Sequence, residues 1–310
     1  MIGSTSRGSR PAGLTSVARA GGTVGLTRAA DERTRQLVDG FVHEAGPPQS
    51  AFAWVALGSH ARGELHCASD QDNALLWADD RAAISSYAAD LADHVITGLE
   101  RFGLRRCDGG YMADRWSMSL ASWIAAARGR IDAPTPQAVL DTEVFLDVRA
   151  IAGDLDIAGA LAVLVEGGHS SRLLHGLASA AVGFPAPLGP FGRLAHTPVD
   201  VKRGGLAPLV LLARLYALVA GSTEVGTVPR LTAAAESLGT ELSERLIRAH
   251  DVLTRLRLER QLSDAEAGRP LTDTVAPRDL SSADHDALRD ALRAVRAGQS
   301  VTALRFRTDL

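Results

Sequence analysis

Residues 54–64 read WVALGSHARGE and residues 69–77 read SDQDNALLW, and these two stretches decide the fold. The first is part of an apolar run that ends at Gly58-Ser59, which predicts a buried strand over 51–57 followed by a turn into a short helix. The second contains an apolar run headed by two aspartates, which predicts another buried strand over 72–77. The pair indicates a small sheet in the N-terminal half of the chain.

The polar residues beside these strands predict a binding site. Asp70 and Asp72 share a face if a strand extends to them, because side chains alternate along a strand, and two carboxylates suit a hard divalent cation. Gly58 lets the backbone approach a phosphate, Ser59 adds a hydroxyl, and Arg62 can bind phosphate oxygens in a forked geometry. Each motif alone is also common in ordinary turns that bind nothing. Together, separated by ten residues, they indicate a metal ion and a triphosphate.

A Gly-Ser pair followed at this distance by Asp-x-Asp resembles the signature of the polymerase-beta-type nucleotidyltransferase superfamily. The strings LGSHARGE (57–64) and SDQDNAL (69–75) resemble the branch often found behind cyclic-nucleotide-binding and CBS domains, which is related to PII uridylyltransferase and glutamine-synthetase adenylyltransferase. Further segments match in order: CDGGYMA at 107–113, FLDVR at 145–149 with Gly153-Asp154, DVKRGGL at 200–206, and Ala213-Arg214. The resemblance covers roughly residues 30–305, and it departs at Ala61, where we expect glycine.

The resemblance implies a third carboxylate on a later strand. Asp147 is our candidate and Asp154 the alternative. If a strand runs over 144–151, Phe145, Asp147 and Arg149 lie on one of its faces. Asp147 would then join the two earlier aspartates as a metal ligand and act as general base toward an attacking hydroxyl. The competing interpretation is an aspartate paired with a neighbouring arginine.

Several basic residues are further candidates. Lys202, the single lysine of the chain, and Arg203 precede a helix expected over 206–220, where the helix dipole disfavours cations without a partner. We expect both to reach the triphosphate; the alternative is a solvated charge pair. Arg214 on the same apolar helix is expected to form a structural ion pair. His60 is expected near the ligand and His250 at the surface.

Composition excludes several classes of protein. The 310 residues include 33 Lys and Arg and 36 Asp and Glu, which gives a formal net charge of -3. This charge disfavours a basic nucleic-acid-coating protein. Cys67 and Cys107 are the two cysteines, too few for a disulfide framework or a Cys-rich zinc site. No apolar stretch reaches the about 20 residues of a membrane span. We therefore expect a cytoplasmic protein with neither nucleic acid nor membrane as partner.

The chain is expected to have an α+β fold with three parts. Residues 1–29, rich in Gly, Ser, Thr and Arg with no acid before Asp31, predict a flexible tail. Residues 30–155 predict a small mixed-sheet nucleotidyltransferase-like catalytic domain. Residues 156–305 predict an α-helical bundle domain.

The expected function is transfer of a nucleoside monophosphate from a nucleoside triphosphate to a hydroxyl, with release of pyrophosphate. Mg²⁺ or Mn²⁺ would be the cofactor. Similarity to the uridylyl- and adenylyltransferases implies a protein acceptor and a role in signalling or metabolic regulation. The alternative is a catalytically weak nucleotide-binding regulatory module that acts with a separate sensory partner.

Overall fold

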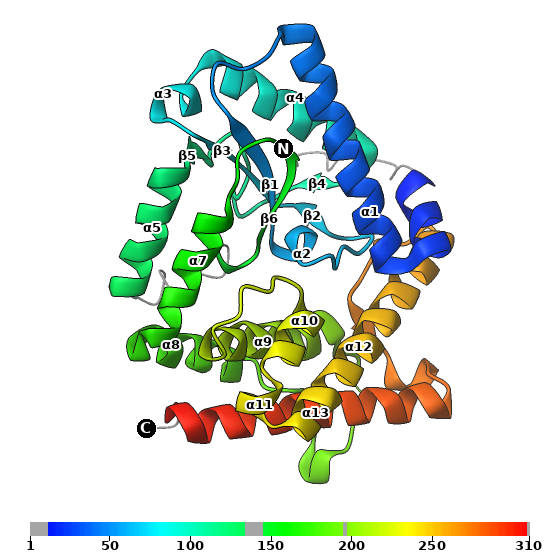
Figure 1. Cartoon of the computed structure of the whole chain (residues 1–310). Coiled ribbons are helices and arrows are strands. Elements are labelled where there is room, and N and C mark those ends of the chain that lie inside the picture. Colours follow the sequence, from blue (N-terminus) through cyan, green and yellow to red (C-terminus); the bar gives the residue numbers. More distant parts are fainter. Residues whose placement is uncertain (1–11, 134–144, 195–196, 309–310) are drawn as a thin grey trace, which may run out of the picture.

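The computed structural model describes residues 12–133, 145–194 and 197–308. At its centre is a four-stranded mixed sheet in the order β5-β3-β1-β6 (Figure 1). The strands are β1 (Phe52–Leu57), β3 (Asn73–Trp77), β5 (Ser117–Ser119) and β6 (Val148–Gly153). β1 is antiparallel to both β3 and β6, whereas β5 is parallel to β3. β1 and β3 are fully buried, as their apolar runs predict.

Two short ladders complete the strands. β2 (Asp70–Gln71) pairs in parallel with β4 (Arg105–Arg106), and β7 (Val199–Asp200) pairs antiparallel with β8 (Thr274–Val275). β7 and β8 lie far apart in the sequence, so this ladder joins two distant segments of the C-terminal half.

One face of the central sheet is covered by two long helices, α1 (Ala12–Ala45) and α4 (Ser86–Phe102) (Figure 1). Phe52, Trp54 and Ala56 point into the core beneath them. The helices pack closely at Gly98, where a Cβ atom would lie 2.3 Å from Leu37 Cδ2. The short helix α3 (Asp80–Ala83) precedes α4.

The expected flexible tail is wrong from Ala12 onward, and residues 1–11 lie outside the described part. The segment is helical, with a non-helical backbone at Gly22, and Leu14, Ala18 and Leu26 are buried in the core beneath α1. Gly, Ser, Thr and Arg between these apolar residues dominate the composition and conceal the helix.

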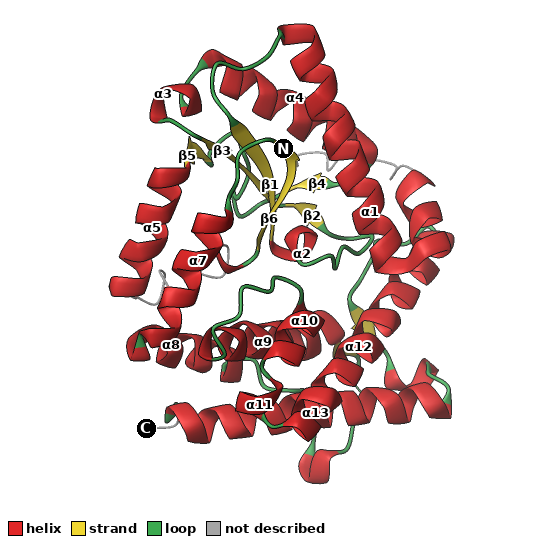
Figure 2. Cartoon of the chain, in the orientation of Figure 1, coloured by secondary structure: helices red, strands yellow, loops and turns green. Residues whose placement is uncertain are grey.

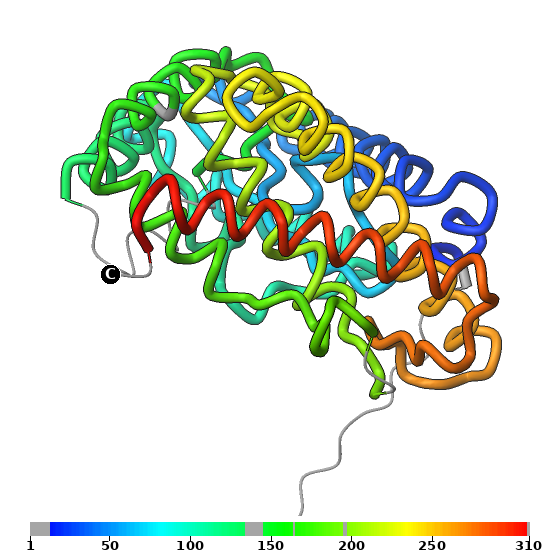
Figure 3. The backbone as a smooth tube through the Cα atoms, turned by 90° about the horizontal axis from the view of Figure 1, so that it is seen from below, coloured from blue at the N-terminus to red at the C-terminus, as the bar shows by residue number. Residues whose placement is uncertain are grey.

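The other face of the sheet joins the helical half of the chain (Figure 2). Ala53, Val55 and Leu57 share one apolar core with residues of the C-terminal helices. The helices that follow β6 are α7 (Ala158–Glu166), α8 (Ser171–Val182), α9 (Ala207–Val219), α10 (Thr227–Ala233), α11 (Ala235–Leu238), α12 (Thr240–Glu266) and α13 (Ser282–Phe306), and α5 (Leu120–Asp132), which precedes β6, packs in the same core. Figure 3 shows α13 lying across the underside of this half, where it contacts α8, α9 and α12.

The predicted α+β class, a small mixed sheet followed by helices, is confirmed. In the described part of the chain, no helix combines the length and apolarity that crossing a membrane requires.

Candidate active site

The glycine-serine turn and the second aspartate are in contact, as the two motifs predict. β1 ends at Leu57, whose N–H donates to the Asp72 carbonyl at 2.9 Å, and Gly58 opens the short helix α2 (Gly58–Ala61). Gly58 has φ +55°, and a Cβ atom there would lie 3.1 Å from Asp72 Oδ2. Only glycine combines this backbone conformation with so close an approach to a carboxylate.

A cavity of about 330 Å³ lies between the sheet and the helical half. Five of the predicted site residues line it: Ser59, Arg62, Asp70, Asp72 and Lys202. The others around it are Glu64, His66, Ser69, Phe184, Leu206, Ala207, Val210, Leu211, Arg214, His250, Thr254 and Arg257. Three predicted residues, Gly58, Asp147 and Arg203, are not among the lining residues.

The two aspartates at the cavity carry negative charge that the protein only partly offsets. Burial raises the pKa of the Asp72 carboxyl, and the negative charge of Asp70 raises this pKa further. A hydrogen bond with the Cys107 thiol acts in the opposite direction. Asp70 Oδ1 forms an ion pair at 2.6 Å with Arg105, which lies opposite it in the β2–β4 ladder. A cation in the cavity would therefore be favoured electrostatically at Asp72.

These oxygen donors fit a Mg²⁺ or Mn²⁺ ion. Mg²⁺ sites in nucleotide-binding proteins combine one or two carboxylates with phosphate oxygens and water, so Asp70 and Asp72 would suffice. Among the described residues, no group of three or more His, Cys, Asp or Glu side chains is arranged to hold a metal. The structure therefore does not bring together the three-carboxylate set that we expected.

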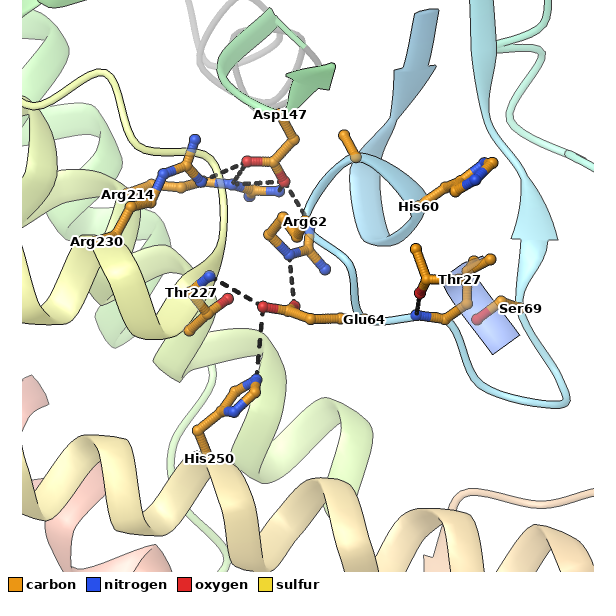
Figure 4. A network of polar contacts seen from close by, with 12 residues as sticks. Thr27, His60, Arg62, Glu64, Ser69, Asp147, Arg214, Thr227, Arg230 and His250 are labelled. Carbon is orange, nitrogen blue, oxygen red and sulfur yellow. Dashed lines mark hydrogen bonds and ion pairs between the residues drawn. The ribbon is translucent and has the colours of Figure 1, made fainter. Parts of the chain in front are cut away.

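Asp147 lies next to the glycine-serine turn, where its carbonyl accepts from the Gly58 N–H at 3.2 Å, but it does not line the cavity. Its side chain has 0% exposure and accepts hydrogen bonds from Arg62, Arg214 and Arg230 (Figure 4). The distances are 2.5 Å from Arg214 Nη2 to Oδ2 and 2.5 Å from Arg230 Nη1 to Oδ1. Despite burial, these arginines hold the pKa of Asp147 far below its usual range. Asp147 is thus an ion-pair anchor, and the expected metal-ligand role is not supported.

The expected strand face around Asp147 is also incorrect. β6 begins at Val148, and Phe145 and Leu146 are helical, so alternation does not reach Asp147. Residue 144 lies outside the described part. The predicted structural ion pair of Arg214 is confirmed by its contact with Asp147, although Arg214 also borders the cavity.

Arg62 joins the glycine-serine turn to this anchor. Its Nε donates to Glu64 Oε2 at 2.7 Å, and its Nη1 donates to Asp147. Burial opposes the shift, but these two carboxylates raise the pKa of Arg62. Arg62 borders the cavity as expected, with much of its hydrogen-bonding capacity directed to protein carboxylates rather than outward.

His60 supports the turn from behind. Its Nε2 lies 2.8 Å from Asp31 Oδ1 on α1, and Arg149 donates to both Asp31 oxygens at 2.9 and 3.0 Å. Arg149 also donates to the carbonyls of His60 and Ala61 at 3.0 Å. His60 is buried and is not among the cavity-lining residues, so the expected ligand contact is replaced by a positioning role.

Sequence reasoning missed the contact between this turn and the helical half. Glu64 Oε1 accepts from the Thr227 N–H at 3.0 Å and lies 3.5 Å from His250 Nε2 (Figure 4). His250 is buried, not at the surface as expected. The signal available in the sequence was Glu64 itself, a carboxylate inside an otherwise phosphate-binding motif.

Lys202 and Arg203, predicted as a pair, have different surroundings. Both begin a π-helical turn, Lys202–Leu206, that leads directly into α9. Lys202 borders the cavity, and its positive charge lowers the pKa of Asp72. Arg203 does not border the cavity. Its backbone N–H donates to Asp200 Oδ1 at 2.8 Å, and its side chain is exposed. π-Helical turns are frequent at functional sites.

Two family models match the chain. Residues 17–137 match the family described as "Putative nucleotidyltransferase DUF294", and residues 171–306 match the "Putative nucleotidyltransferase substrate binding domain". The chain belongs to this nucleotidyltransferase family. The comparison with curated proteins finds no match.

The two matched ranges meet at the cavity. Ser59, Asp70 and Asp72 belong to the first range, and Lys202 and Thr254 to the second. Asp147 falls in the stretch between the two ranges.

Proposed function

We propose that this nucleotidyltransferase transfers a nucleoside monophosphate from a nucleoside triphosphate to a hydroxyl and releases pyrophosphate. The observation that carries the proposal is the contact of Asp72 with the Gly58 turn at the edge of a cavity that Asp70 also lines. Acids and a phosphate-binding turn at one cavity are what transfer from a metal-bound triphosphate needs.

Each residue at the cavity has a proposed part. Asp70 and Asp72 would hold Mg²⁺ or Mn²⁺, which, when bound, neutralises charge on the phosphates. Gly58 and Ser59 offer backbone and hydroxyl donors to the β- and γ-phosphates. Lys202 approaches the phosphates from the helical half. Fixing these groups before substrate arrives lowers the cost of reorganisation during the reaction.

The acceptor is proposed to be a hydroxyl of a protein, in a signalling or regulatory role. The support is the resemblance to uridylyl- and adenylyltransferases and the matched substrate-binding domain over 171–306. That domain forms one wall of the same cavity.

A second candidate is a nucleotide-binding regulatory module with little turnover. The burial of Asp147 beneath three arginines favours it, because the expected general base is then withheld from the cavity.

A transfer assay separates the two candidates. The full chain is incubated with Mg²⁺ and each of the four α-labelled nucleoside triphosphates, with and without cell lysate. Label transferred to an acceptor, and lowered more than about 100-fold by Asp72→Asn, supports the enzyme. Asp93→Asn on the exposed side of α4 is the matched control and should transfer normally. Nucleotide binding without transfer supports the regulatory module, and normal transfer by Asp72→Asn contradicts the assigned site.

A further inference from the structure

The cavity has two chemically different walls. The acids and the glycine-serine turn come from the sheet side, whereas every apolar lining residue comes from the helical side. Phe184 lies in the loop after α8, Leu206 ends the π-helical turn, and Val210 and Leu211 belong to α9. The phosphates of a nucleotide would bind at the wall that carries the acids and the glycine-serine turn. The apolar wall is then available to the less polar part of the nucleotide.

The spacing along α9 shows how the walls connect. Lys202, Leu206, Val210 and Arg214 line the cavity at intervals of four residues, which places them on successive turns of one helix face. Lys202, at one end of this stripe, lines the same cavity as Asp72. The apolar middle of the stripe therefore continues directly from the phosphate end.

Polar atoms without partners lie on the neighbouring helix. Thr254 Oγ1 and His250 Nδ1 are buried and make no hydrogen bond within the described structure. The nearest acid to His250 Nδ1 is Asp251 Oδ1 at 3.7 Å, beyond hydrogen-bond length. Both residues line the cavity from α12, one turn apart on the same face. Buried polar atoms normally find partners, so two orphans at one cavity point to a polar ligand edge.

We propose that the nucleobase of the triphosphate packs on Leu206 and Val210 and that Thr254 and His250 hydrogen-bond its polar edge. This proposal rests on the proposed function, because it assigns the base of the same nucleotide whose phosphates face Asp70 and Asp72. A base is flat and largely apolar on its faces and polar at its edge, which matches an apolar stripe flanked by orphan donors and acceptors. The other occupant of this wall would be the acceptor.

Binding measurements test the proposal without activity. Isothermal titration of the full chain with Mg²⁺ compares the four nucleoside triphosphates with inorganic tripolyphosphate. We expect the favoured triphosphate to bind at least about tenfold more tightly than tripolyphosphate. Thr254→Val keeps the shape but removes the hydroxyl, and should weaken that triphosphate about 3- to 10-fold while leaving tripolyphosphate unchanged. Thr232→Val, on the exposed face of α10, is the matched control.

A second variant guards against a folding effect. Ala207→Trp fills the apolar wall from α9 and should exclude nucleoside triphosphates while tripolyphosphate still binds. Equal binding of tripolyphosphate and every nucleoside triphosphate overturns the base site but leaves the proposed function standing. An unchanged base preference in Thr254→Val likewise overturns the proposed base site and assigns the apolar wall to the acceptor. Failure of both ligands to bind removes the proposed function as well.

Discussion

Gly58 is the residue on which the contact between the two motifs depends. Its φ is +55°, which disfavours any L side chain, and a Cβ atom at this position would lie only 3.1 Å from Asp72 Oδ2, so the carboxylate would have to shift. Gly58→Ala should therefore displace the Asp72 carboxylate and lower nucleotide affinity about tenfold, with a stability cost of about 1–2 kcal/mol from the backbone alone. Titration calorimetry and urea unfolding measure the two effects.

The matched control is Gly40→Ala in α1, where nothing lies within 4 Å of the new Cβ atom. That substitution should leave nucleotide affinity unchanged and raise stability slightly, because alanine favours a helix interior. Wild-type nucleotide affinity in Gly58→Ala would show that the turn does not position Asp72.

Asp31 predicts a specific pH dependence of stability. Although burial opposes the shift, His60 and Arg149 lower the pKa of Asp31 to about 2 from an ordinary value of 3.8. A carboxyl with a depressed folded-state pKa stabilises the fold above its unfolded pKa and loses that contribution as pH falls through the folded pKa. The contribution of about 2 kcal/mol should thus be complete above pH 4 and fade toward pH 2.

Urea unfolding of wild type and Asp31→Asn from pH 7 to pH 3 measures this contribution. The two free energies of unfolding should differ by a constant amount at neutral pH and converge below pH 4. A difference that is unchanged down to pH 3 would contradict the assigned ion pairs.

At the scale of elements, apolar runs with clear ends could be predicted from sequence. β1 and β3 lie within one residue of their predicted ranges, because each is a short buried run bounded by glycine or by polar residues. α9 likewise begins within a residue of its prediction. The contact between the Gly58 turn and Asp72 followed from the same pattern, because the polar ends of neighbouring strands had to meet.

Elements whose partners come from distant sequence could not be predicted in this way. The first half of α1 packs in a core that Leu258 and Leu262 of α12 also contact, and Arg19 pairs with Glu266, which its Gly- and Ser-rich composition does not reveal. The position of Asp147 depends on arginines from α9 and α10 that only the tertiary fold brings together. His250 lies on a polar helix, and its burial follows from Glu64 across the cavity.

At the scale of the whole molecule, Asp147 joins the sheet to the helical half through Arg214 and Arg230. Removing the acid leaves buried arginines uncompensated, so Asp147→Asn should cost about 3–5 kcal/mol in urea unfolding. Asp286→Asn, which removes an exposed partner of Arg289, is the control and should cost less than about 1 kcal/mol. A stability close to wild type in Asp147→Asn would instead favour an acid available for metal binding.

The shared apolar core predicts that the two halves unfold together. One face of β1 packs in the same core as the C-terminal helices, so neither half buries its apolar surface alone. The four tryptophans all precede residue 124 and report on the sheet and α5, whereas far-ultraviolet circular dichroism reports mainly on the helices. Both signals should give one coincident urea transition. Separate transitions would show that the halves are independent.

Mg²⁺-dependent nucleotide binding tests the central claim most directly. Nucleoside triphosphates are titrated calorimetrically into wild type and Asp72→Asn, each in Mg²⁺ and in EDTA, with Asp93→Asn as control. We predict that Mg²⁺ strengthens binding to wild type and the control, and that Asp72→Asn loses this enhancement by more than about tenfold. An Asp72→Asn protein whose binding responds to Mg²⁺ as wild type does would contradict the assignment of the acids beside the Gly58 turn as the metal site.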